Sequence, residues 1–200
     1  MIHPHMETAS DTILAVTLGA ILAAAGGFVA GQAERRLHRR ARERAAAMLF
    51  GEILLGMKLT LEAADRLRGQ GDPFGPVTLR TLEAARREFD AYDRSREMLM
   101  ELTRTELRTR LHTLMVRLRL GLDGVMEISG MIAKASADDL ASRAFLDQGR
   151  ARSYAYLQEL SDRIPAMITR LEQVSGQEVS GMMRDLRAEL ELDLSAPAGG

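Results

Sequence analysis

An uncharged run of 19 residues, Thr12 to Ala30, constrains this chain more than any other feature. A helix rises about 1.5 Å per residue, so such a run spans roughly 28 Å, close to the thickness of a bilayer's hydrocarbon core. Eight strongly apolar side chains in the run together favour insertion by roughly 2 to 5 kcal/mol, at about 0.3 to 0.6 kcal/mol each. The run therefore predicts a single N-terminal transmembrane helix over residues 12–31.

The charges on either side of this run predict its orientation. Residues 1–11 contain no Lys or Arg, whereas six arginines follow the run: Arg35, Arg36, Arg39, Arg40, Arg42 and Arg44. Loops rich in Lys and Arg stay in the cytoplasm, which predicts an outside amino terminus and a cytoplasmic remainder. Each of these arginines would also contribute about 1 kcal/mol of attraction to an anionic lipid surface. Arg greatly outnumbers Lys, and Ala and Gly are abundant, which suggests a GC-rich bacterial genome and hence a bacterial inner membrane.

Two alternatives to a retained anchor remain open. A cleaved signal peptide fits poorly, because residues 1–11 carry Glu7 and Asp11 instead of a basic region, although residues 31–33 form an acceptable cleavage site. The run could also form a buried helix of a soluble protein.

Small residues recur at every fourth position of the run: Ala15, Gly19, Ala23, Gly27 and Gly31. This spacing lets two membrane helices approach closely. Gly costs helix stability relative to Ala, so its presence favours a packing role, although an Ala-rich chain supplies small residues cheaply at any spacing. We expect self-association through Gly19, Ala23 and Gly27, with Gly31 continuing the face.

The composition of the rest of the chain predicts an all-α protein. Aromatic residues make up 4 %, Trp is absent, and Ala, Leu, Arg, Glu and Met dominate, all of which form helices well. The lack of Cys excludes disulfides and thiolate chemistry. Apolar residues at spacings of three and four predict helices over four ranges: 32–68, 78–102, 103–135 and 136–174.

Local signals set the expected helix ends. Residues 69–76 are rich in Gly and Pro and predict a loop; this loop lacks the GxxxxGK[ST] pattern of a phosphate-binding loop. Arg96 interrupts the apolar face of the second helix, and residues 103–106 match a capping box for the third. Ser136 is expected to cap the fourth helix, which Pro165 should kink or divide.

These helices predict an antiparallel bundle of about four helices, with the first continuing from the membrane segment. The expected organisation is an outer tail (1–11), a transmembrane helix (12–31), a basic helical stalk (32–44), the bundle (45–175), a short amphipathic helix (176–194) and a disordered tail (195–200). The third helix has near-heptad apolar spacing, as in coiled coils. Met182, Met183 and Leu186 on the short helix are the expected partner surface.

No residue pattern points to catalysis, a cofactor or a metal site. His3 and His5 form only a weak pair near the amino terminus, and neither HExxH nor ExxH occurs. Carboxylates pair with arginines at i,i+4, as in Glu106 and Arg110, which is typical of solvated helix faces. Several methionines could line an adaptable groove, but a flexible bundle core is the simpler interpretation: Met98, Met100, Met115, Met126 and Met131.

The sequence thus predicts a membrane-anchored cytoplasmic helical adaptor that self-associates, recruits a protein partner of unknown identity and has no catalytic activity. Nucleic-acid binding is disfavoured, because the net charge is −1 and stacking aromatics are scarce. A transmembrane signal relay is the first alternative, and a ligand-binding bundle or membrane-bound enzyme is the second.

Overall fold

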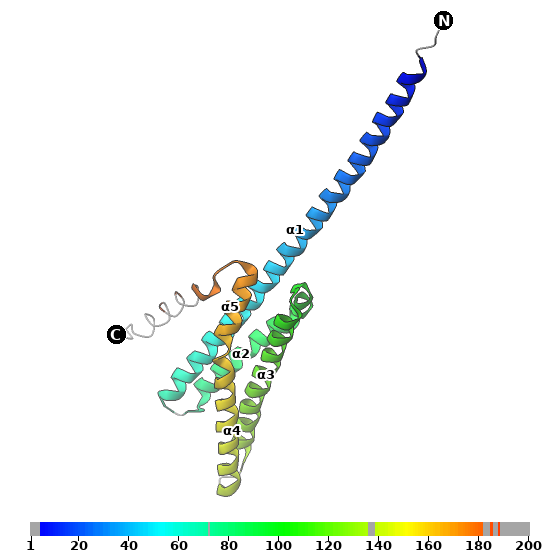
Figure 1. Ribbon diagram of the computed structural model, residues 1–200. Helices are drawn as coiled ribbons and strands as arrows, with labels where there is room; N and C mark the ends of the chain where they lie inside the picture. Colours follow the sequence, from blue (N-terminus) through cyan, green and yellow to red (C-terminus); the bar gives the residue numbers. More distant parts are fainter. Residues whose placement is uncertain (1–4, 72, 136–138, 182–184, 186–187, 189–200) are drawn as a thin grey trace. The chain divides into compact units, whose positions relative to one another are not determined.

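All regular secondary structure in the described residues is helical, so the all-α prediction is confirmed. The computed structural model describes the backbone of residues 5–71, 73–135, 139–181, 185 and 188, and within these the side chains of residues 26–28 and of residues from 30 onward. The elements are α1 (His5–Gly69), α2 (Pro76–Arg94), the 3-10 helix η1 (Arg96–Glu101), α3 (Thr105–Lys134), α4 (Leu140–Ser161) and α5 (Ile164–Ser175) (Figure 1).

The chain divides into two compact units, residues 1–42 and 43–200, and α1 contributes to both. The helix is unbroken from His5 to Gly69, as the lack of proline between residues 32 and 68 predicted. The boundary between the units falls inside the predicted stalk, residues 32–44. The predicted bundle, residues 45–175, lies within the second unit.

Apolar stripes of the helices in the second unit meet in one core. The apolar residues at spacings of three and four on α1 are buried, with Leu67 half-buried: Ala46, Phe50, Ile53, Met57, Leu61 and Ala64. Those of α2 and α3 are also buried, apart from the half-buried Ile128 and Ile132: Leu82, Ala85, Phe89, Tyr92, Leu107, Leu111, Leu114, Leu118, Leu122 and Val125. The largest fully buried side chains include Phe50, Leu54, Met57, Leu82, Leu111, Met115, Leu118 and Tyr154.

Long-range contacts show that neighbouring helices run antiparallel. Between α1 and α4, Lys58 contacts Ser161 and Asp65 contacts Tyr154, so the numbering rises on one helix as it falls on the other.

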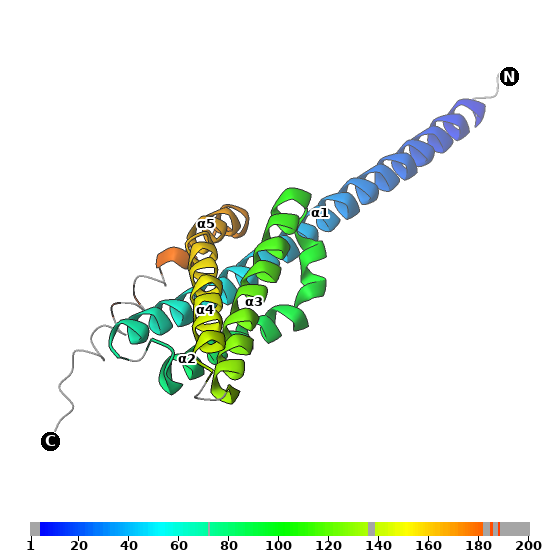
Figure 2. The ribbon, with the colours of Figure 1, turned by 90° about the horizontal axis from the view of Figure 1, so that it is seen from below.

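The same reversal relates the other neighbouring helices. Between α2 and α3, Arg86 pairs with Asp123 and Asp93 pairs with Arg119. The helices α3 and α4 lie side by side and are joined by a short connection (Figure 2). The predicted antiparallel helical bundle is therefore confirmed.

Small residues let α3 and α4 approach closely. A Cβ atom at Gly121 would lie 3.3 Å from Leu157 Cβ and 3.5 Å from Leu157 Cα, and one at Gly124 would lie 3.1 Å from Ser153 Oγ. Side chains at these positions would push the two helices apart. These glycines were not recognised in the sequence, because their role depends on which helix faces them.

The second helix begins and ends differently from its prediction. It starts at Pro76 instead of Thr78, because proline fits the first helical turn, where its missing N–H would have no partner. It ends at Arg94, just before the predicted interruption at Arg96, and residues 96–101 form η1 instead of continuing the helix.

The capping box predicted at residues 103–106 is wrong. Arg104 precedes the first helical residue of α3 and provides no side-chain cap. The backbone N–H of Thr103 donates to Glu43 Oε1 at 2.9 Å, and the Thr103 hydroxyl donates to the same oxygen. A partner 60 residues away has therefore replaced the local cap.

Three other predicted helix ends have clear outcomes. Ser136 lies outside the described residues. Asp139 caps α4 by accepting a 3.0 Å hydrogen bond from the Ser142 N–H, and hydrogen bonds from the side chain and the backbone of Ser142 lower the pKa of the Asp139 carboxyl. The predicted division at Pro165 is confirmed, since α4 ends at Ser161 and α5 begins at Ile164. Gly176 ends α5 at a φ of 74°, a left-handed conformation that glycine adopts without strain.

Candidate functional site

The predicted association face lies only partly within the described residues. The side chains of Gly19 and Ala23 are outside them. At Gly27 and Gly31, an added Cβ atom would meet nothing within 4 Å. The face at these two glycines is therefore open within the described chain, and its use in self-association stays a prediction.

Among the residues that the structure describes, no helix is long and apolar enough to cross a membrane. The side chains of residues 12–25, most of the predicted span, lie outside that described part. The transmembrane helix therefore stays a prediction.

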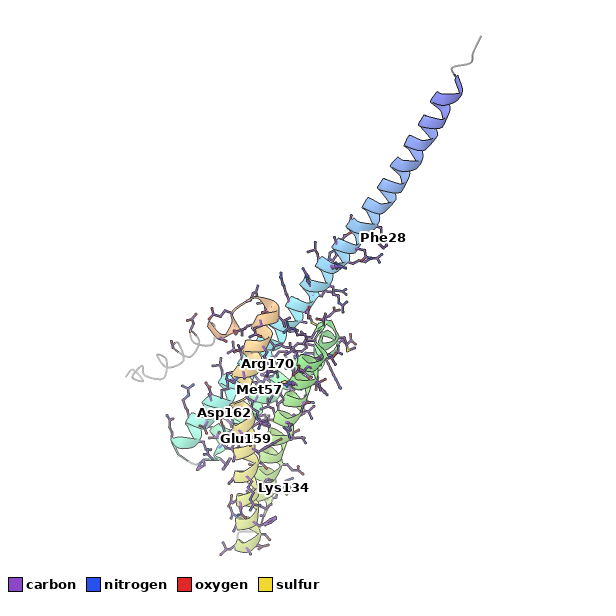
Figure 3. The ribbon with its side chains drawn as sticks, viewed as in Figure 1. Phe28, Met57, Lys134, Glu159, Asp162 and Arg170 are labelled. Carbon is purple, nitrogen blue, oxygen red and sulfur yellow. The ribbon has the colours of Figure 1, made fainter. Side chains whose placement is uncertain are left out.

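The six arginines that follow the predicted span all lie exposed on α1: Arg35, Arg36, Arg39, Arg40, Arg42 and Arg44. Two exposed apolar side chains accompany them, Phe28 (Figure 3) and Leu37, with 68 % and 66 % of their surface accessible. Phe28 and Leu37 line one shallow hollow of the helix surface with Arg36 and Arg40. This mixture of apolar and cationic side chains on one helix surface suits an interface between water and lipid.

The predicted partner surface of Met182, Met183 and Leu186 lies outside the described residues. The residues just before it are fixed to the bundle. Val179 is buried, and its Cγ2 lies 3.3 Å from the position of a Cβ at Gly51. The Ser180 N–H donates to the Glu172 carboxylate on α5.

The methionines are divided between core and surface. Met115 is buried, and Met98 and Met126 pack against the core, as the simpler interpretation predicted. Met100 and Met131 are exposed. The core interpretation is therefore wrong for Met100 and Met131, and the five methionines do not line one groove.

His112 on α3 is hydrogen-bonded to Tyr92 on α2. Its Nδ1 lies 2.7 Å from the Tyr92 hydroxyl, and the two rings stack with their centroids 6.3 Å apart. Burial raises the pKa of Tyr92 to about 12. The pair joins α2 to α3 beside the exposed apolar residues Val116 and Leu120.

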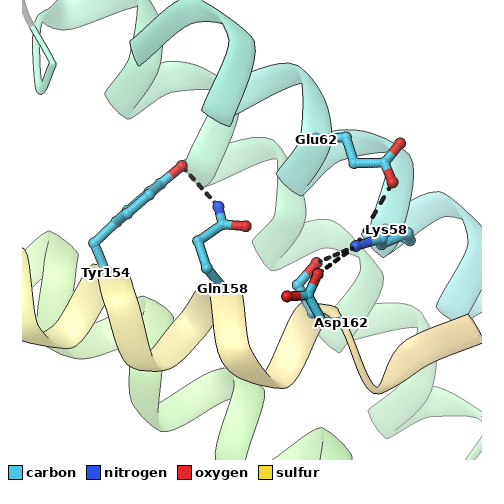
Figure 4. Close-up of polar contacts among 6 residues, drawn as sticks. Lys58, Glu62, Tyr154, Gln158 and Asp162 are labelled. Atoms are coloured by element: carbon cyan, nitrogen blue, oxygen red, sulfur yellow. Dashed lines mark hydrogen bonds and ion pairs between the residues drawn. The ribbon is translucent and has the colours of Figure 1, made fainter. Parts of the chain in front are cut away.

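A polar cluster around Lys58 was missed in the sequence (Figure 4). Lys58 lies on α1 with only 6 % of its surface exposed, and its Nζ donates to Ser161 Oγ at 3.1 Å and to Asp162 Oδ1 at 3.3 Å. Glu62 Oε1 lies 3.6 Å from the same nitrogen. All three contacts are to oxygen atoms, so the amine is held as a structural cation between α1 and the end of α4.

A second polar cluster continues along the same seam. The Tyr154 hydroxyl donates to Asp65 Oδ1 at 3.1 Å and accepts from Gln158 Nε2 at 2.8 Å. Burial and the nearby Asp65 carboxylate raise the pKa of Tyr154 to about 12. The Arg68 guanidinium lies 4.5 Å from the centre of the Tyr154 ring. Both clusters link α1 to α4 and thereby fix how these helices pair.

A hollow of about 390 Å³, here called the arginine groove, lies between α3 and the α4–α5 junction. Leu114, Leu160 and Met167 form its buried apolar floor. Four arginines line it, two on each side: Arg110, Arg117, Arg163 and Arg170. The signal in the sequence is a pair of arginines seven residues apart in each of two segments, which gains meaning only once the segments are known to be neighbours.

The arginine groove is suited to binding anions and unsuited to acid–base or metal chemistry. Its described lining contains no Asp, Glu, His or Cys. Across the described residues, no group of three or more His, Cys, Asp or Glu side chains could hold a metal ion. No family model, curated protein or solved structure significantly matches the chain.

Proposed function

We propose that this protein is a membrane-anchored helical interaction module of the bacterial inner membrane, with its amino terminus outside and its bundle in the cytoplasm. The observation that carries the proposal is the uncharged run of residues 12–30 followed directly by exposed arginines on the same helix, α1. In this proposal the apolar run anchors the chain and the arginines contact anionic headgroups.

The bundle acts as a scaffold without catalytic activity in this proposal. Its conspicuous buried polar side chains support this role, because they satisfy one another: Lys58 is held by Ser161, and the Tyr154 hydroxyl bonds Asp65 and Gln158. The open surface that remains is a set of grooves between helices, which suits binding of another chain.

Thiol labelling tests the anchor and its orientation, because the chain has no native Cys. Thr8→Cys should react with a membrane-impermeant maleimide in intact spheroplasts. Ala141→Cys, at an exposed position of α4, should react only after lysis. Release of the protein into the supernatant when membranes are washed at alkaline pH, or labelling of Ala141→Cys in intact spheroplasts, would contradict the proposal.

Self-association is proposed through the small-residue face of the anchor. Single cysteines at Gly19, Ala23 and Gly27 should form disulfide-linked dimers under mild oxidation. Ile21→Cys and Ala25→Cys are matched controls, since positions two residues from Ala23 lie nearly opposite it on a helix. Equal dimer yields at all five positions would rule out a specific face.

The unbroken α1 supports a second candidate, a relay that couples anchor packing to the bundle. This helix carries both the predicted span and the core residues Phe50 and Met57. A relay predicts that replacing Gly19 and Gly27 with Leu changes hydrogen exchange in α3 and α4. Unchanged exchange there would leave the anchor as a tether only.

A further inference from the structure

The arginine groove has a regular arrangement of charge. Arg110 and Arg117 are seven residues apart on α3, and Arg163, which directly precedes α5, is seven residues before Arg170. Seven residues make two helical turns, so the arginines of each side stand about 10 Å apart along the groove. An occupant should therefore be elongated and carry more than one negative charge.

Two of these arginines are only partly neutralised and two have no neighbouring carboxylate. Arg110 pairs with Glu106 at 2.6 Å and Arg163 pairs with Glu159 at 2.5 Å, in both cases along the arginine's own segment of chain. Within the described residues, Arg117 and Arg170 have no carboxylate within ion-pair distance. The groove thus keeps an excess of positive charge over an apolar floor.

The chain itself contains a segment of matching chemistry. Residues 189–194 read Glu-Leu-Glu-Leu-Asp-Leu, three acids alternating with three leucines and no basic residue. In an extended chain, alternate side chains face opposite sides at about 3.3 Å per residue. The leucines would then meet the groove floor, while carboxylates spread over about 13 Å would meet arginines whose long side chains reach up from the walls.

The described chain brings this segment close to α5. Ser180 is bonded to Glu172, two residues beyond Arg170 on α5. Eight residues lie between Ser180 and Glu189, and these nine steps span at most about 30 Å when extended. As a helix, the conformation of Gly181, Asp185 and Ala188, they span about 14 Å. The acidic segment therefore begins near α5, which contributes one wall of the groove.

We propose that the arginine groove binds residues 189–194 of its own chain in extended form, in place of the end of the short helix expected over residues 176–194, as an intramolecular docking site for an acidic, leucine-rich peptide. Its occupancy does not depend on the membrane anchor, so this proposal can fail while the proposed function stands.

Disulfide trapping in the full-length protein, in mild detergent at low concentration, tests the docking. Thr113→Cys lies in the groove wall and is combined with Leu192→Cys. The matched control combines Leu192→Cys with Thr169→Cys, which is exposed on α5 outside the groove. The groove pair should form an intramolecular disulfide at least about tenfold faster than the control pair, as measured by mass spectrometry of digested monomer.

Charge variants show whether the arginines cause the trapping. Arg117→Glu combined with Arg170→Glu should reduce the rate for the groove pair to that of the control pair. Arg117→Lys combined with Arg170→Lys keeps the charge and should keep most of the rate. Circular dichroism of each variant establishes that the bundle is folded.

Three results would overturn the proposal. Equal rates for the groove and control pairs would mean that the segment does not dock there. A rate unaffected by charge reversal would remove the arginines from the explanation. Disulfides that form only between two chains would assign the groove to a second copy of the protein.

Discussion

Replacing Lys58 by alanine and, separately, by methionine distinguishes the packing of its aliphatic stem from its ionic contacts. Alanine removes three methylenes from a side chain that is almost fully buried, at about 0.8 kcal/mol for each. It also removes the hydrogen bond to the buried Ser161 hydroxyl. Because the variant no longer buries an ammonium group, the net loss of stability from this bond is about 1 kcal/mol. We expect Lys58→Ala to lower the free energy of unfolding by about 3–4 kcal/mol.

Methionine keeps the length and most of the volume of lysine, so the methylene contribution is retained. The lost ion pairs cost little, because the Asp162 side chain is 78 % exposed and solvent screens its charge. The remaining penalty is the Ser161 hydroxyl that loses its partner, and we expect Lys58→Met to cost only about 1 kcal/mol.

Urea titration in mild detergent, followed by far-ultraviolet circular dichroism, measures both values. Lys134→Met is the matched control, because Lys134 is exposed at the end of α3 (Figure 3) and should shift stability by less than about 0.5 kcal/mol. A Lys58→Met variant as unstable as Lys58→Ala would refute this reasoning and show that the ionic contacts dominate.

Three further perturbations test other parts of the bundle. The pKa of Tyr154 is raised to about 12, so the stability that its neutral hydroxyl contributes should be complete below pH 10 and lost as the pH rises towards 12. Between pH 9 and pH 11.5, the free energy of unfolding from urea titration should fall by about 1–2 kcal/mol more in the wild type than in Tyr154→Phe. Equal losses would contradict this cause. Gly121→Leu should cost about 2–3 kcal/mol by overpacking the α3–α4 seam in the same assay, whereas Gly130→Leu, where a Cβ meets nothing within 4 Å, should cost nothing measurable. Thr103→Val should cost about 0.5–1 kcal/mol in wild type but not in a Glu43→Ala background, and a cost that persists there would show that the interhelical bond is not responsible.

Periodicity in the sequence was sufficient to predict the helices and most of the core. The stripe through Phe50, Met57 and Leu61 is buried because a spacing of three and four keeps side chains on one helix face. Pro165 marked a break correctly, because its effect arises from its own backbone chemistry.

What the sequence did not reveal depends on partners far along the chain. Thr103 resembles a helix cap until Glu43, 60 residues earlier, is known to lie beside it. Lys58 resembles a surface lysine until Ser161 supplies a hydroxyl to it. Likewise, Arg117 and Arg170 can be recognised as lining one groove only once α3 and α5 are known to be neighbours.

The burial of Lys58 also determines how this protein responds to amine chemistry. The chain has only two lysines, and the other, Lys134, is exposed at the end of α3. Reagents and enzymes that modify lysine amines should therefore meet one accessible side chain in the folded bundle. The rate at which the Lys58 amine is modified then reports how often the seam between α1 and α4 opens. Lys134 in the same molecule is the internal reference for reagent activity.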